Sequence, residues 1–437
     1  MCSLKQICIK ELFLLILLTF CVNSVFAYDF FVGGIYYNKK GTDEVWVTYG
    51  DHPYAGSISI PRIVEYKNVT YKVTGIGVNA FKDNEELTYV NILDNIREIG
   101  SGAFRGCRYL TSIEIPNTVT RIDSCTFKGC YRLSFIDLPN SINYIGPNAF
   151  FNCEIEEIRI PASMTSIDSC AFAWCKNLKT LHIPNHITKI GPGAFEGCGA
   201  KNVIIPNSVK SIGAGAFCCS KMEYIEIPDG ITKIEDETFA ACWDLKTIKI
   251  PNSVTSIGDE SFDACESLKN IQIPNSVTSI GHSAFKDCKN LTTISIPNSV
   301  TKLGFLAFWC CKNLREVNLS NRLSNIEGNT FFNCMGLKEV VIPEGIDTIE
   351  SGAFENCENL LKVTIPSSVT CIEENAFDEC YSLTSVTSLI PADKLFKIDS
   401  NVFDTKSNCT LYVPKGAKWT YKETEGWYGF QKTIELE

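Results

Sequence analysis

The chain has 437 residues, of which 45% are hydrophobic and 21% are charged, so it can bury a core and is not a disordered polymer. Its formal net charge is −10, and no run rich in Lys or Arg occurs anywhere in it. The basic surface that nucleic acid or an anionic membrane requires is therefore missing, which disfavours both classes of partner, and we expect no nucleic-acid partner.

The first residues form a predicted export signal. Lys5 and Lys10 precede an apolar run over 12–22, and Ala27 ends a Val-Phe-Ala sequence, so residues 1–27 resemble a signal peptide that is cut after Ala27. The apolar run is shorter than the roughly 20 residues of a membrane span, and no second run follows. We expect an exported chain, extracellular or at the cell surface with the periplasm as an alternative, and no membrane insertion after cleavage.

Residues 28–56 predict an N-terminal β cap. This segment is rich in aromatic and β-branched residues and is punctuated by Gly34 and by the polar stretch 38–43, a pattern typical of two or three short strands. A hairpin is expected just beyond it, over 65–73. Because the end of a repeat array exposes an apolar cross-section, an atypical terminal unit is needed to cover it.

The rest of the chain repeats one unit. Residues 251–273 and 274–296 are two consecutive 23-residue segments that share 13 identical positions. A phenylalanine marks each copy, at intervals of 22 or 23 residues until a last step of 26. These markers are Phe81, Phe104, Phe127, Phe150, Phe172, Phe195, Phe217, Phe239, Phe262, Phe285, Phe308, Phe331, Phe354, Phe377 and Phe403. The period predicts one solenoid of about fifteen coils over 57–403, on the order of 70 Å long.

A single coil has a readable pattern. In the segment 291–296, Ile294 and Ile296 alternate with polar residues, which predicts a strand with one buried face. Pro297 ends this strand because it lacks an N–H group. Gly304 is expected to permit a tight bend, and the segment 304–311 is expected to form a short helical turn or an irregular segment.

Residues 404–437 depart from the repeat and predict a C-terminal cap. Trp419, Trp427, Tyr428 and Phe430 form a dense aromatic group that suits a lid over the last coil, with a platform for carbohydrate as the alternative. A final strand is expected over 433–436.

The unit LTTISIPNSVTKLGFLAFWCC, residues 291–311, resembles the BspA-type leucine-rich repeat, and the resemblance covers about residues 57–414. It implies a right-handed leucine-rich-repeat solenoid with a parallel β-sheet on one face and short helical turns or irregular segments on the other. It also implies a place at or outside the cell surface and adhesion to host matrix proteins or to other microbes. The family has no catalytic residues, so none is transferred to this chain.

Nineteen of the 22 cysteines follow residue 27, and twelve of these stand three residues after a marker phenylalanine. We call this position the slot; Ser220 fills it in one coil. The spacing favours buried free thiols that act as small apolar side chains, although stacked coils could also allow disulfides. The cysteines outside the slot are expected to be the more reactive ones, and they are Cys125, Cys170, Cys218, Cys219, Cys310, Cys371 and Cys409.

Catalytic, metal and cofactor sites are not predicted. The four histidines, His52, His182, His186 and His282, form no H-E-x-x-H motif, and the sequence has no C-x-x-C and no glycine-rich phosphate loop after a strand. We therefore expect a protein that is not an enzyme and needs no cofactor.

The predicted functional signal is the variation between coils. Strand alternation places two rows of side chains outward on one sheet, and these rows differ from coil to coil while the core repeats. This pattern predicts a face that binds a protein first and a glycan second, or else unconstrained solvent positions on a passive spacer or surface-coat protein. The candidate binding residues are Tyr89, Phe135, Arg159, His182, Tyr224 and Lys249.

Overall fold

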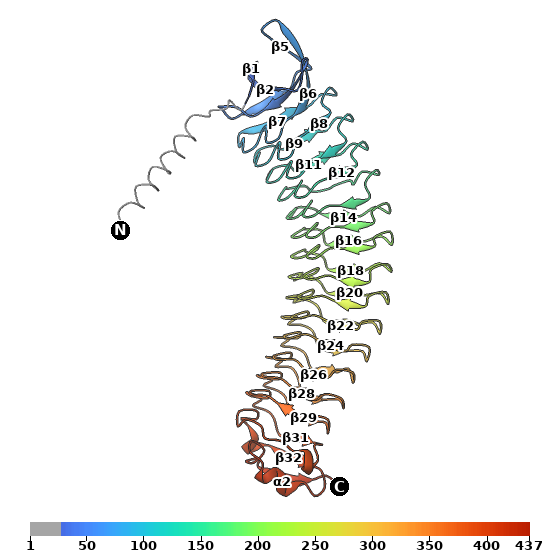
Figure 1. The fold of residues 1–437 in the computed structure, drawn as a ribbon, viewed down its shortest axis with the longest axis vertical. Helices are drawn as coiled ribbons and strands as arrows, with labels where there is room; N and C mark the ends of the chain where they lie inside the picture. The colour runs from blue at the N-terminus through green and yellow to red at the C-terminus, as the bar shows by residue number, and fades with distance from the viewer. Residues whose placement is uncertain (1–27) are drawn as a thin grey trace, which may run out of the picture.

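The computed structural model describes residues 28–437, and the predicted signal peptide lies outside them. The chain forms a long, curved solenoid with its N-terminal cap at one end and its C-terminal segment at the other (Figure 1). Regular structure is almost entirely β. The helical segments of the described part are three short ones, η1 Ala392–Lys394, η2 Lys406–Asn408 and α2 Lys418–Glu423. The predicted fold class, a repeat solenoid with a parallel sheet on one face, is confirmed.

The N-terminal cap is a β-sheet that continues into the solenoid. Its first three strands are antiparallel neighbours, β1 Phe30–Val32, β2 Ile35–Lys39 and β3 Glu44–Thr48. The predicted hairpin follows as β5 Ile63–Tyr66 and β6 Val69–Ile76. Lys67 and Asn68 have left-handed φ angles of 50° and 62°, as a two-residue hairpin turn requires. Because β6 also pairs in parallel with β3 and with β8 Glu98–Ile99, the cap sheet runs directly into the coils.

One side of most coils carries a parallel strand, and we call the surface formed by these strands the strand face. Most of its strands have an exposed, buried, exposed pattern, which produces the two outward rows. They are β4 Gly56–Ser59, β7 Leu87–Asn91, β9 Ser112–Glu114, β11 Phe135–Asp137, β14 Thr180–His182, β16 Asn202–Ile204, β18 Tyr224–Glu226, β20 Thr247–Lys249, β23 Thr293–Ser295, β25 Glu316–Asn318, β27 Glu339–Val341, β29 Lys362–Ile365, β31 Ser385–Ser388, β32 Thr410–Val413 and β33 Lys432–Glu435.

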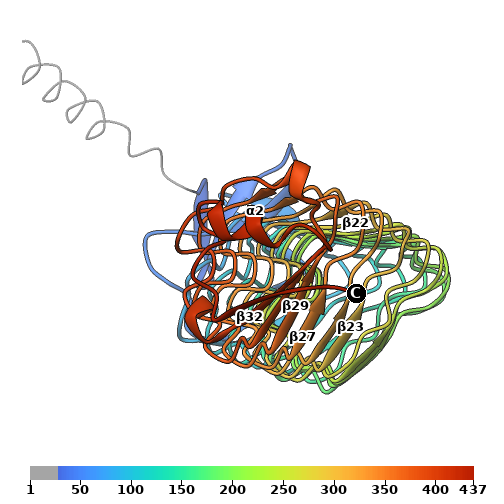
Figure 2. The ribbon, with the colours of Figure 1, turned by 90° about the horizontal axis from the view of Figure 1, so that it is seen from below.

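A second parallel sheet covers another side of the coils. Its members are mostly two-residue strands whose second residue is buried, and Figure 2 shows one of them, β22, away from β23, β27, β29 and β32. After β8 they are β10 Arg121–Ile122, β12 Tyr144–Ile145, β13 Ser166–Ile167, β15 Lys189–Ile190, β17 Ser211–Ile212, β19 Lys233–Ile234, β21 Ser256–Ile257, β22 Ser279–Ile280, β24 Lys302–Leu303, β26 Asn325–Ile326, β28 Thr348–Ile349 and β30 Cys371–Ile372. The sequence did not predict this sheet, because two residues are too few to show alternation.

The third side is built from turns, so of the two alternatives for 304–311 the helical one is wrong. The amides of Ala307 and Trp309 donate to carbonyl oxygens three residues back, at 3.2 and 3.0 Å, whereas those of Phe308 and Cys310 donate to the next coil, at 2.9 and 2.8 Å. The amides can alternate between these two kinds of partner because Cys310 and Leu306 have left-handed φ angles of 58° and 59°. Alternate amides therefore hold the coil together and bind it to its neighbour.

The expected role of Gly304 is also corrected. Its φ is not in the left-handed region, so it does not serve a special bend. A Cβ atom at Gly304 would lie 2.5 Å from the backbone of Gly281 and His282 in the preceding coil. Glycine is needed here because the two backbones approach each other closely.

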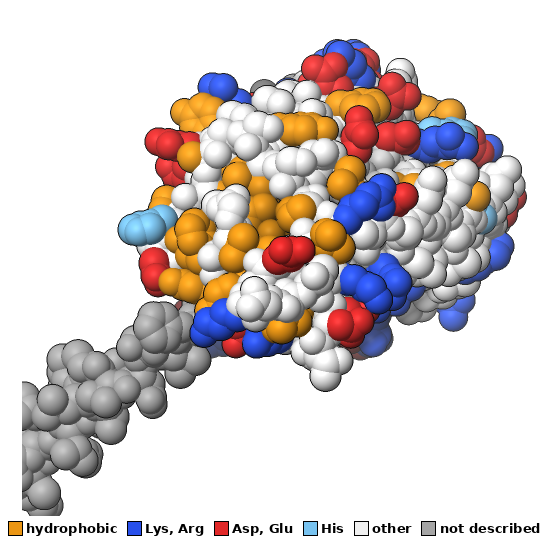
Figure 3. Space-filling view, turned by 90° about the horizontal axis from the view of Figure 1, so that it is seen from above, with side chains coloured by type: hydrophobic (Ala, Val, Ile, Leu, Met, Phe, Trp, Pro, Cys, Tyr) orange, Lys and Arg blue, Asp and Glu red, His pale blue; other side chains and the backbone are white. Residues whose placement is uncertain are grey.

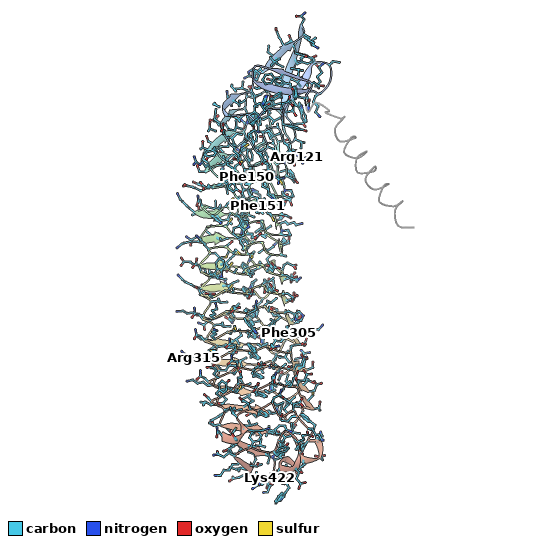
Figure 4. All side chains as sticks on the ribbon, turned by 90° about the vertical axis from the view of Figure 1, so that its left-hand side faces the viewer. Arg121, Phe150, Phe151, Phe305, Arg315 and Lys422 are labelled. Atoms are coloured by element: carbon cyan, nitrogen blue, oxygen red, sulfur yellow. The ribbon has the colours of Figure 1, made fainter. Side chains whose placement is uncertain are left out.

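The core is a ladder of phenylalanine rings. All fifteen marker rings are buried, and successive ring centroids lie between 5.1 Å, as for Phe81 and Phe104, and 5.9 Å, as for Phe217 and Phe239. Phe150, labelled in Figure 4, belongs to this ladder. Tyr54 continues it at the N-terminal end at 4.7 Å, and Trp427 at the C-terminal end at 6.1 Å. The ladder therefore runs from cap to cap.

The two ends close the core in different ways. At the C-terminal end, the Trp427 Nε1–H donates to the carbonyl oxygen of Phe396 at 3.0 Å and the Tyr421 hydroxyl to that of Ile390 at 2.8 Å. The helix α2, which carries Tyr421, was not predicted, whereas the expected final strand is present as β33. At the N-terminal end, hydrophobic side chains gather in the middle of the end face, with charged groups at its rim (Figure 3). Phe31 and Tyr49 are among the exposed side chains of this cap.

Candidate functional site

The structure places the six predicted binding residues on the outer side of the coils. Phe135 and Tyr224 are 62% and 48% exposed, and Arg159, His182 and Lys249 are also exposed, whereas Tyr89 is half-buried. Five of the six lie on strands. Arg159 does not, because the coil over 155–160 forms no strand. The sheet of the strand face is therefore interrupted between β11 and β14.

The middle of the strand face contains a groove, which we call the central groove. Strands β14 and β16 place His182 beside Ile204, and β16 pairs with β18 so that Asn202 faces Tyr224. The groove has a volume of about 640 Å³, and its walls include His182, Ile204, Tyr224, Glu226, Asn207 and Asp229. Two large apolar side chains thus lie among polar ones in a surface depression.

Ile204 is the residue that the sequence-based selection of candidates missed. Its side chain is 63% exposed although it is a large aliphatic group on a strand. The sequence did contain a signal for Ile204, because it is an apolar residue in an outward row that is otherwise mostly polar. The candidate binding residues were chosen among aromatic and charged side chains instead. The structure adds Ile204 to Tyr224 and His182 as part of one surface.

Ion pairs run along the strand face beside the central groove. Lys249 pairs with Glu226, and this contact holds the pKa of the Glu226 carboxyl below its usual range. Glu223 lies between Lys246 at 2.6 Å and Lys201 at 3.2 Å, and these lysines likewise lower its pKa. The groove is therefore bordered by paired charges and carries no large field of one sign.

Tyr89 and Phe135 lie nearer the N-terminus and do not line the central groove. Strand β4 pairs with β7 so that Ser57 faces Tyr89, and β9 pairs with β11 so that Ser112 faces Phe135. Further aromatic and basic side chains lie in the same coils and were not selected from the sequence. The guanidinium of Arg132 is 4.4 Å from the ring centre of Tyr109, and that of Arg108 is 5.7 Å from that of Tyr131. Of the six candidates, His182 and Tyr224 line the central groove, and the other four do not.

Two other depressions differ in chemistry from the central groove. One of about 700 Å³ lies farther along the strand face and is lined by polar residues such as Gln272, Ser295 and Asn318. The other, of about 460 Å³, lies where the N-terminal cap meets the first coil and includes Tyr49, Asp51, His52 and Lys82. Neither combines two exposed large apolar side chains on neighbouring strands.

The slot cysteines have a defined partner. Each slot thiol donates to the carbonyl oxygen of the marker phenylalanine of the preceding coil, as Cys265 does to Phe239 at 3.2 Å. All 19 cysteines of the described residues are free thiols, and burial raises the pKa of slot members such as Cys175 and Cys357 to about 12. The slot therefore selects a small hydrogen-bond donor.

The cysteines outside the slot differ in exposure. Cys371 is exposed, Cys125, Cys170, Cys218 and Cys219 are half-buried, and Cys310 and Cys409 are buried. Burial raises the pKa of Cys310, and it raises that of Cys409 to about 12. Because these two thiols are also shielded from reagents by burial, the expectation of high reactivity is wrong for them.

Over residues 28–437, no three His, Cys, Asp or Glu side chains are grouped so that they could hold a metal ion. Within the same range, the chain has no helix with the length and apolar character of a membrane span.

These features define the class of protein: a leucine-rich-repeat solenoid with a parallel β-sheet and an extended outward surface. The family model for the BspA type leucine rich repeat region (6 copies) matches residues 62–179, 165–292, 232–360 and 278–411. The chain therefore belongs to the BspA-type leucine-rich repeat family.

Solved structures agree with this assignment. A leucine-rich repeat protein from Bacteroides ovatus is 31% identical, with 94% of this chain and 100% of that chain covered and a TM-score of 0.73. A leucine rich cell surface protein from Faecalibacterium prausnitzii is 29% identical, with coverages of 84% and 96% and a TM-score of 0.53. No protein with a curated description matches the chain.

Proposed function

We propose that this chain is an exported, non-enzymatic protein that binds a protein partner through its strand face, in the manner of a cell-surface adhesin. The observation that carries the proposal is the exposure of Ile204 and Tyr224 together in the central groove. Apolar and aromatic side chains in a desolvated pocket provide most of the binding energy of protein interfaces, whereas polar surroundings contribute specificity.

The construction of the solenoid supports a binding role. Its buried positions repeat from coil to coil, so outward residues can change without disturbing the stack. The similarity to a leucine rich cell surface protein supports a place at the cell surface, and the resemblance of residues 1–27 to a signal peptide supports export.

An array of matrix proteins, mucins and glycans, probed with the purified chain, tests this function. Beside the wild type we would apply the triple variant Tyr89→Ala, Phe135→Ala, Tyr224→Ala, with circular dichroism to check that it folds. We expect saturable binding to at least one protein and its loss in the variant. Silence across the array would favour a passive spacer, and binding to glycans alone would favour a glycan-binding module.

A further inference from the structure

A pair of adjacent cysteines on the turn side of the solenoid differs from the other thiols. The Sγ atoms of Cys218 and Cys219 lie 3.5 Å apart, and both residues are half-buried. Neither residue occupies the slot, since Ser220 does so and donates to the carbonyl oxygen of Phe195 at 2.9 Å. Both sulfur atoms are therefore free of the hydrogen bond that holds the slot cysteines.

The backbone explains why the two sulfur atoms meet. Cys219 has a left-handed φ of 58°, which turns its side chain relative to that of its neighbour. Hydrogen bonds fix the coils on either side, from the Gly197 amide to the Cys218 carbonyl at 2.7 Å and from the Cys219 amide to the Ala240 carbonyl at 2.8 Å. These contacts use backbone atoms alone, so neither thiol takes part in them.

The chain contains a matched pair that lacks this arrangement. Cys310 and Cys311 are also adjacent, but here the left-handed residue is the first of the pair, Cys310 with a φ of 58°, whereas in the other pair it is the second, Cys219. Cys311 occupies the slot and donates to the carbonyl oxygen of Phe285 at 3.2 Å, while the Cys310 sulfur accepts from the Asn333 side-chain amide at 3.0 Å. Both are buried. The two sulfur atoms are thus held by different partners.

We propose that Cys218 and Cys219 form a redox-active dithiol that a small-molecule disulfide, such as oxidised glutathione, converts into a disulfide between the two adjacent residues. In the first step, the thiolate of Cys219 attacks one glutathione sulfur, which forms a mixed disulfide and releases one glutathione thiolate. The Cys218 thiolate then attacks the Cys219 sulfur, forms the Cys218–Cys219 bond and releases the second glutathione. The two protein thiols lose two electrons and two protons. One molecule of oxidised glutathione takes them up and becomes two molecules of reduced glutathione.

The order of the steps follows from the surroundings of Cys218. Burial and the hydrogen bond between the Cys218 and Cys219 thiols raise the pKa of the Cys218 thiol, so less thiolate is present at that sulfur, which favours Cys219 as the first attacker. The resulting bond is strained, because adjacent Cα atoms are about 3.8 Å apart, below the range of about 4.4 to 6.8 Å in ordinary disulfides. Strained disulfides are readily reduced, so we expect reversible oxidation.

Peptide mass spectrometry tests the proposal on the purified folded protein. After incubation with oxidised glutathione, acid quenching and alkylation in denaturant, trypsin releases SIGAGAFCCSK (211–221) and LGFLAFWCCK (303–312), each with one cysteine pair. We expect the first peptide to lose two hydrogen atoms and to regain both thiols in a moderate excess of reduced glutathione. The second peptide should carry two alkyl groups.

Two variants make the test specific. Cys218→Ser should leave a glutathione adduct on Cys219, because the resolving thiol is missing, and Cys310→Ser should leave oxidation of the first pair unchanged. Two alkylated cysteines in the first peptide, a stable glutathione adduct in the wild type, or equal oxidation of both peptides would each overturn the proposal.

Discussion

The Oγ of Ser220 donates to the carbonyl oxygen of Phe195 across 2.9 Å, where other coils have a cysteine thiol. In the next coil Cys242 contacts Phe217 in the same way at 3.1 Å. Serine and cysteine share a small volume and a single donor. The position therefore selects for a donor to a buried carbonyl oxygen as well as for small size.

This relationship predicts different effects for two substitutions of Cys265. Cys265→Ala removes the donor from the buried carbonyl oxygen of Phe239 and should lower the free energy of unfolding by about 1–3 kcal/mol. Cys265→Ser retains a donor and should cost less than Cys265→Ala. Urea unfolding followed by circular dichroism measures both. If the serine variant proved less stable than the alanine variant, the thiol hydrogen bond would not be the reason why cysteine recurs at this position in the coils.

The phenylalanine ladder predicts a contrast within one coil. Phe308→Ala removes a buried ring that stacks on both neighbours, at 5.3 and 5.4 Å, and should cost about 3–5 kcal/mol. Phe305→Ala should change the stability by only about 0.5 kcal/mol, because Phe305 lies at the edge of the solenoid (Figure 4) and is 40% exposed. The urea concentrations at the unfolding midpoint of the two variants measure this difference. If both variants lost the same stability, the phenylalanine ladder would not be the main source of stability in this coil.

A row of carboxylates predicts a pH dependence. Glu355 and Asp404 have pKa values raised by burial and by the charge of Asp378, which lies in the coil between them. Since their folded pKa exceeds the unfolded one, their contribution to stability is complete below the unfolded pKa and is lost as the pH rises through the folded pKa. Asp378→Asn should therefore raise the melting temperature at pH 7 by about 1–2 °C.

The same variant should have a smaller effect at pH 4, where the carboxyl groups are more protonated. Asp393→Asn, at an exposed position, is the control and should leave the melting temperature unchanged. Melting curves for both variants between pH 4 and pH 7 check the sign. A loss of stability in Asp378→Asn at pH 7 would mean that the three carboxylates do not repel one another.

The left-handed turn positions predict that glycine is favourable where alanine now stands. Ala264 has a φ of 54°, a conformation that costs an alanine about 1–2 kcal/mol, whereas the entropy cost of glycine is about 0.5–1 kcal/mol. Ala264→Gly should thus stabilise the protein slightly. Ala284→Gly, at a buried position that is not left-handed, should destabilise it. Thermal unfolding of the two variants should shift in opposite directions.

The sequence predicted the elements that repeat with a clear period. Buried strand residues such as Ile294 alternate with polar neighbours, and the phenylalanines recur at a fixed interval, so the coil and its stacking could be predicted. The second sheet could not, because its strands have two residues each. The turn side could not either, because Cys310 and Ala264 adopt left-handed conformations that are usually left to glycine or asparagine.

The candidate site was only partly predictable, because a groove depends on how neighbouring coils align. The outward rows followed from alternation alone, which is why Tyr224 and His182 were selected. That Ile204 lies beside them, and that Phe135 does not line the same groove, depends on spatial neighbours. The positions of residues within the two outward rows do not determine which side chains of neighbouring coils lie together.

The most direct test of the strand face as a binding surface is the Kd of the strongest protein ligand from the array for three forms of the chain. These are the wild type, the double variant Ile204→Ser, Tyr224→Ala, and Val341→Ser, whose side chain is exposed on the same face outside the central groove. We predict that the double variant raises the Kd at least tenfold, about 1.4 kcal/mol, and that Val341→Ser leaves it unchanged. Equal affinity for the wild type and the double variant would contradict the proposal that the central groove binds the partner.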